Sequence, residues 1–227
     1  MDKTQLFLLV APVLLFSMVA HEYAHGYAAL RNGDPTAYQL GRLTWNPIKH
    51  IDPFMTILLP ILTFFGGGFI FGGAKPVPVN PRNFTNYKRG DIMVSLAGIV
   101  TNLAIAILFV PLIAFIGLIG RQFPAANESL FLVQLMFRYG IYINLLLAMF
   151  NLLPIPPLDG SHVAKYILPP AWALSYQRIG RYGMLLLIAM LTFGRPVLNF
   201  WLSPVWALSN AADSLLSPFF LRSQWTA

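Results

Sequence analysis

Two histidines and one glutamate near the start of the chain stand at a spacing that binds metal ions. The segment reads His21-Glu22-Tyr23-Ala24-His25. On a helix, residues four positions apart lie on one face, so both imidazoles can bind one metal ion while Glu22 faces a water molecule beside it. Placing polar groups of this kind in an apolar helix costs free energy. They are therefore usually paired with other polar groups or belong to a functional site. The pattern predicts a metal site with Glu22 as the base; the alternative is a set of polar side chains hydrogen-bonded within a helix bundle.

A catalytic zinc ion commonly takes three protein ligands and one water molecule, so the two histidines need a third partner. The chain has no cysteine, which leaves His50, His162 and the carboxylates as donors. The carboxylates besides Glu22 are Asp2, Asp34, Asp52, Asp91, Glu128, Asp159 and Asp213. We expect His50, in a basic segment, to be solvated. His162 is an alternative ligand or a partner of one, although an interfacial position is the simpler expectation.

Asp159 is the carboxylate whose expected depth best matches that of the histidines. It follows an apolar stretch at 131–153 that we expect to cross the membrane in the same direction as the stretch containing His21. The prolines within 154–157 stop the helix before it, and Gly160 permits a tight turn that could swing the carboxylate inward. The alternative role for Asp159 is to cap the next helix.

Asn102 is a further polar residue within an apolar stretch. Gly98 and Ala106 flank it at helical spacing, and such small residues let helices approach closely. The rise of a helix places its amide at about the depth of the expected metal ion. Asn102 could therefore bind a substrate carbonyl, while its alternative role is a hydrogen bond between helices.

The composition indicates that the chain is embedded in a membrane. Hydrophobic residues make up 57% of the 227 residues and charged residues 10%, whereas soluble domains have roughly 25% charged residues. The mean hydropathy is +0.64. There are 15 lysines and arginines against 8 acidic residues, scattered between apolar stretches, which indicates membrane topology and not nucleic-acid binding. We expect one membrane-embedded domain over 1–227, with a catalytic core at about 5–165 and C-terminal helices at about 178–221.

The apolar stretches lie at about 5–30, 53–71, 92–119, 131–153, 182–202 and 204–221. A spanning helix needs about 20 residues, which the glycine-rich stretch at 53–71 barely reaches. If that stretch enters the membrane and returns to the side from which it came, most basic residues lie on one side of the membrane, as the positive-inside rule prefers. We therefore expect an all-α polytopic membrane protein with about five to six transmembrane helices and a re-entrant segment. We place it in the cytoplasmic membrane, with the active site near the cytoplasmic side.

The segment 75–81, KPVPVNP, alternates valine with proline. Alternate prolines exclude a helix and leave an extended edge with few hydrogen-bond donors. We expect a small β-strand or extended element here, to which an unwound substrate segment could add as a strand. The alternative is a stiff loop.

Taken in order along the chain, these motifs resemble those of the site-2 protease family of intramembrane zinc metalloproteases. HEYAH at 21–25 is similar to the family's HExxH, and NLLPIPPLDG at 151–160 is similar to its NxxPxPxLDG. SLAGIVTN at 95–102 resembles a small-residue and asparagine motif on the next core helix. GRLTWNPIKHIDP at 41–53 and AKPVPVNP at 74–81 look like a compact bacterial branch without a PDZ domain.

The resemblance implies one Zn²⁺ per chain, held by His21, His25 and Asp159, with Glu22 as the catalytic base. It implies an enzyme that hydrolyses a peptide bond within or next to a transmembrane segment of a membrane protein substrate. The expected partners are thus a transmembrane protein or peptide and the lipid bilayer, and we make no prediction of oligomeric state. The main alternative is a membrane metal-ion transporter or channel that uses the His/Asp cluster, and a second is an inactive scaffold that binds membrane helices.

Overall fold

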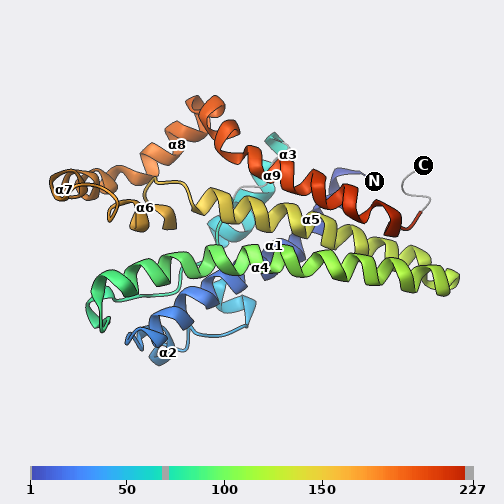
Figure 1. Cartoon of the computed structure of the whole chain (residues 1–227), viewed down its shortest axis with the longest axis horizontal. Coiled ribbons are helices and arrows are strands. Elements are labelled where there is room, and N and C mark those ends of the chain that lie inside the picture. The colour runs from blue at the N-terminus through green and yellow to red at the C-terminus, as the bar shows by residue number, and fades with distance from the viewer. Residues whose placement is uncertain (1, 68–71, 223–227) are drawn as a thin grey trace.

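Three long helices form the centre of the computed structural model, which describes residues 2–67 and 72–222. These helices are α1 (Lys3–Arg31), α4 (Tyr87–Gln122) and α5 (Asn127–Asn151). They pack against one another along the long axis of the molecule (Figure 1). Apolar side chains of all three form the main core, for example Val13, Ile113 and Ile141. The long apolar stretches of the sequence thus become one helical bundle.

Shorter helices surround this bundle. The helices α2 (Thr36–Gln39) and α3 (Leu59–Gly67) lie in the connection between α1 and α4. The helices α6 (Asp159–Ala164), α7 (Pro170–Ile179) and α8 (Gly183–Phe193) follow α5, and α9 (Arg195–Leu216) returns along α5 (Figure 1). Single turns or short irregular helices occur at Pro47–His50, Pro53–Leu58, Pro81–Asn83, Pro124–Ala126, Gly180–Tyr182 and Ser217–Phe219.

The protein is an all-α membrane protein, but the expectation of five to six spanning helices is wrong. Among the described residues, three helices are long and apolar enough to cross a membrane, or four if one bent pair counts as a single span. The bent pair turns by 87° at Gly194, so the apolar stretch at 182–202 is no straight helix. At 11 residues, α8 is about 16 Å long by helix rise, roughly half of the hydrocarbon core.

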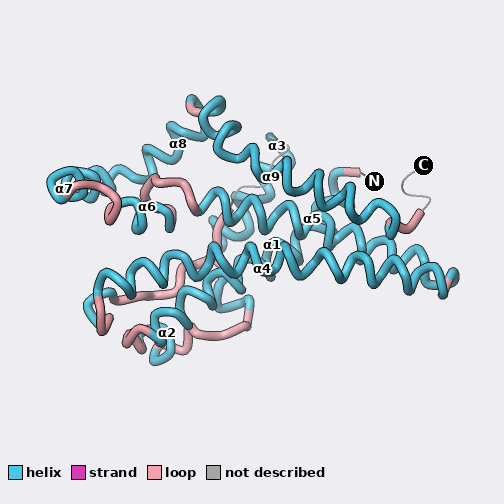
Figure 2. Tube along the Cα trace, in the orientation of Figure 1, coloured by secondary structure: helices cyan, strands magenta, loops and turns pink. Residues whose placement is uncertain are grey.

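The stretch at 53–71 forms an irregular helix at Pro53–Leu58 and then α3, and residues 68–71 lie outside the described part. This is too short for a span of about 20 residues. That the segment enters and leaves on one side stays a prediction. The expected small β-strand element is not supported: residues 72–80 lie outside any helix, and residues 2–67 and 72–222 contain no strand (Figure 2). Its prolines have no N–H to donate to a neighbouring strand.

An ion pair attaches α9 to α5. The guanidinium of Arg138 donates through Nε and Nη2 to the two carboxylate oxygens of Asp213, at 3.1 and 3.0 Å. It also lies 4.1 Å from the centre of the Phe220 ring. Charged groups within apolar helices are expensive unless they are paired, so this contact fixes the position of α9 on the bundle.

Asp34 joins the connection after α1 to the segment before α4. Its side chain is fully buried, and its carboxylate accepts hydrogen bonds from the Asn80 N–H at 2.7 Å and from Asn83 Nδ2 at 2.8 Å. Thr36 donates to the same carboxylate through its N–H and its hydroxyl. Burial alone raises the pKa of Asp34, but these hydrogen bonds outweigh burial and hold the pKa below its usual value.

We predict that Asp34→Asn lowers the unfolding free energy at pH 7 by about 1–3 kcal/mol, because it replaces one acceptor oxygen by an NH₂ donor that faces buried donors. A carboxyl with a lowered pKa stabilises the fold above its unfolded pKa of about 3.9, and this stabilisation is lost as the pH falls toward the lower folded pKa. Thermal unfolding in detergent should therefore show a gap between variant and wild type that narrows below about pH 4. A gap of equal size at both pH values would contradict the role of the charge.

Candidate metal centre

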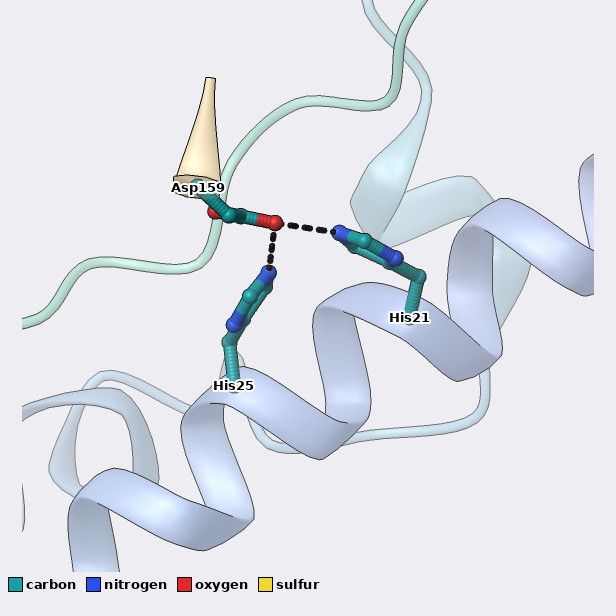
Figure 3. Close-up of side chains that lie close together, drawn as sticks. All are labelled: His21, His25 and Asp159. Atoms are coloured by element: carbon teal, nitrogen blue, oxygen red, sulfur yellow. Dashed lines mark hydrogen bonds and ion pairs between the residues drawn. The ribbon is translucent and has the colours of Figure 1, made fainter. Parts of the chain in front are cut away.

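Two helices bring together three side chains that could bind a metal ion. His21 and His25 lie one turn apart on α1, and Asp159 is the first residue of α6 (Figure 3). One carboxylate oxygen, Oδ2, lies 3.1 Å from His21 Nε2 and 3.2 Å from His25 Nε2. The three donor atoms all lie within 4.8 Å of one another. No other group of this kind occurs in the part of the chain that the structure describes.

Hydrogen bonds fix the orientation of both imidazoles. His21 Nδ1 lies 2.5 Å from Asn102 Oδ1, and His25 Nδ1 lies 2.7 Å from the carbonyl oxygen of Val94. Amide and carbonyl oxygens only accept, so Nδ1 carries the hydrogen in each ring. Each Nε2 of a neutral imidazole then presents a lone pair toward Asp159. Histidines that bind metals are commonly held in this way.

The donor set fits a zinc ion. Two nitrogen lone pairs and a carboxylate oxygen facing one another repel unless a cation lies between them. Ligands 2.0–2.2 Å from a tetrahedral zinc ion lie about 3.3 Å apart, close to the two nitrogen–oxygen distances found here.

A buried hydrogen-bond network supports His21. Asn102 is fully buried on α4, and its Nδ2 donates to Asn144 Oδ1 on α5 at 2.8 Å. Asn144 Nδ2 in turn donates to the hydroxyl of Ser17 on α1 and to the carbonyl of Gly140, both at 2.8 Å. The amide of Asn102 therefore connects helices and orients a histidine in this structure. Its role in substrate binding stays a prediction.

Glycines let the metal-binding groups approach the backbone closely. A Cβ atom at Gly98 would lie 2.5 Å from ring atoms of His21, so only glycine leaves room for this imidazole against α4. A Cβ atom at Gly160 would lie 2.2 Å from the carbonyl oxygen of Leu152. The turn between α5 and α6 is thus compact enough to bring Asp159 back toward α1.

Glu22 contacts the extended segment 72–80, which we call the strap. Its Oε2 accepts a hydrogen bond of 2.7 Å from the N–H of Val77. Arg42 Nη2 donates to the strap carbonyls of Lys75 and Pro76 at 3.1 and 3.3 Å. The strap therefore lies beside the carboxylate that the sequence predicts to be the base.

Other donors from the sequence are placed elsewhere. His50 is fully buried, contrary to the expectation that it is solvated; its Nε2 lies 2.9 Å from the carbonyl of Thr44, and its own carbonyl accepts from the Lys75 N–H. His162 Nδ1 donates to Asp91 at 3.2 Å and is not one of the three clustered donors. Both residues are occupied by local structure.

Sequence reasoning missed two parts of the site. Asn144 is a polar residue inside the apolar stretch at 131–153, so the argument that singled out Asn102 applies to it equally. The carbonyl of Val94 carries no signal in the sequence, since any residue supplies a carbonyl. Its role depends on how α4 packs against α1.

Comparisons with known proteins identify the family of this chain. The profile described as peptidase family M50, the site-2 protease family, matches residues 117–193, which contain Asp159. YwhC of Bacillus subtilis, a candidate zinc metalloprotease by its name, is 37% identical over 206 residues, 91% of this chain and 88% of the relative. Rip2 of Mycolicibacterium smegmatis, named in the same way, is 31% identical over 86% of this chain and 70% of its own length. No solved structure matched the chain.

We predict that Gly98→Ala displaces the His21 imidazole and weakens zinc binding about tenfold or more, the size of effect seen when a metal ligand loses its support. The weakening is measured as the number of zinc ions bound per chain when the concentration of free zinc is limiting. Gly120→Ala is a matched control on the same helix, because its Cβ atom would crowd Leu221 instead of the metal-binding residues. Equal zinc loss in both variants would attribute the effect to overpacking of α4.

Proposed function

Because the chain belongs to peptidase family M50, we infer that it is a zinc-dependent protease which hydrolyses a peptide bond within or next to a transmembrane segment of a membrane protein. The observation that carries this function is the convergence of His21, His25 and Asp159 from helices far apart in the sequence. These three residues would hold one zinc ion. When bound, zinc supplies a Lewis acid that makes a nearby water molecule more acidic and polarises the scissile carbonyl.

Glu22 is the proposed general base. It follows His21 directly on α1, and one of its carboxylate oxygens is held by the Val77 N–H. This contact leaves Oε1 to take a proton from the attacking water and to return it to the leaving amine nitrogen. An ion path has no need of such a base between two ligands, which favours the protease over a metal transporter.

A membrane-spanning substrate must unwind locally before it is cleaved. The carbonyls of a transmembrane helix are held in internal hydrogen bonds and are not open to attack. His21 and His25 are buried, whereas the Asp159 side chain is 21% exposed, and this exposure supports access for an extended peptide segment and for water. We place the site at the cytoplasmic face of the cytoplasmic membrane, because lysine and arginine flank the site in sequence and the positive-inside rule locates such segments there.

We predict about one zinc ion per purified wild-type chain and a large loss of zinc in Asp159→Ala. Glu22→Gln should keep the zinc ion but lower cleavage by roughly 10²–10⁴-fold, the usual contribution of a general base. Cleavage is measured in liposomes with a panel of single-span proteins whose spans contain glycine or proline.

The wild type and the two variants separate the outcomes. A folded wild type without zinc would overturn the metalloprotease, and full zinc content in Asp159→Ala would remove Asp159 from the site. Zinc flux into the liposomes that persists in Glu22→Gln, without any cleavage by the wild type, would favour a transporter.

A further inference from the structure

A second polar cluster lies where α4 begins and α6 ends. Asp91, in the first turns of α4, is 4% exposed. Its carboxylate lies 2.5 Å from Lys165 Nζ and accepts hydrogen bonds from the Tyr166 hydroxyl at 2.8 Å and from His162 Nδ1 at 3.2 Å. We call these four residues the Asp91 latch. All three partners of Asp91 belong to α6 or to the two residues that follow it.

The pair of Asp91 and Lys165 at the centre of the latch is largely buried, whereas the His162 side chain is 48% exposed. The ammonium of Lys165, whose side chain is 11% exposed, lies 5.0 Å from the centre of the Tyr166 ring and 5.8 Å from that of Tyr87. Lys88 lies 5.4 Å from the same Tyr166 ring. Removing one partner would leave a buried charge without compensation, which is strongly unfavourable.

The helix α6 needs an outside contact to stay in place. It has six residues, far below the length at which a helix is stable alone, and its N-cap residue, Leu158, provides no side-chain cap. Its packing partner is α4. The Asp91 latch supplies the polar part of that contact. The three partners of Asp91 follow Asp159 in the chain by three residues or more.

Residues along one face of α4 orient or make room for all three proposed metal-binding residues. Val94, one turn after Asp91, orients His25 through its carbonyl. Gly98 and Asn102, one and two turns further along, make room for His21 and orient it. Asp91 completes this row by acting on the helix that carries the remaining ligand.

We propose that Asp91 is a positioning residue of the metal centre: by holding α6 against α4, it sets the Asp159 carboxylate opposite the two imidazoles. The inference rests on the proposed role of Asp159 as a zinc ligand. Asp91 contacts His162, Tyr166 and Lys165 and none of the three donor atoms, so it acts through the placement of α6.

Zinc release tests the proposal directly. The purified full-length protein is loaded with Zn²⁺ in detergent, and release into excess chelator is followed well below the temperature of unfolding. We expect Asp91→Asn to release zinc about tenfold faster than the wild type. Tyr166→Phe removes one hydrogen bond and keeps the charge pair, so we expect release roughly 2–5 times faster. Tyr166→Phe decides the matter if Asp91→Asn does not fold.

Asp213→Asn is the matched control, because it breaks another helix-to-helix ion pair on α9, away from the three donors. It should lower the midpoint of thermal unfolding and leave zinc release unchanged. Asp91→Asn and Tyr166→Phe could release zinc at the wild-type rate while Asp159→Ala loses its zinc. This result would overturn the positioning role of Asp91 and leave the proposed function intact. Faster release from Asp213→Asn, equal to that of Asp91→Asn, would also overturn it. A wild type that binds no zinc would overturn both proposals.

Discussion

Polar groups buried between membrane helices have no water to bind, and this constraint decides where α1, α4 and α5 meet. His21, Asn102, Asn144 and Ser17 satisfy one another across the three helices. Leaving one such group without a partner costs about 1–3 kcal/mol, so the three helices must keep one register at this level. The imidazole of His21 is thereby fixed before any metal ion binds, with its second nitrogen directed at Asp159.

Asp159, the proposed third ligand, depends on a different kind of support. Asp159 belongs to a helix too short to be stable by itself, placed by a compact turn and by contacts with α4. Gly160 permits that turn because a side chain there would meet the carbonyl of Leu152. The metal centre thus combines a rigid half on α1 with a half whose position is set entirely by tertiary contacts.

Local patterns predicted the residues of the site better than the fold around it. The HExxH spacing and the proline-rich turn before Asp159 act over a few residues, and the structure brings their side chains together. The number of spans was wrong because hydropathy averages over a window and does not register the 87° bend at Gly194. The burial of His50 was missed because it depends on contacts with Thr44 and the strap, which no local pattern describes.

The sequence separation of the donors has a consequence for biosynthesis. His21 and Asp159 are 138 positions apart, with α4 and α5 between them. A chain still being inserted into the membrane therefore contains His21, Glu22 and His25 but lacks Asp159, the third residue of the proposed zinc site, until α6 is made. With Asp159 as a ligand, a nascent chain has no complete zinc site, and neighbouring proteins at the insertion machinery are safe from premature cleavage. On the proposed role of Asp159, proteolytic competence would arise only when α6 docks against α4.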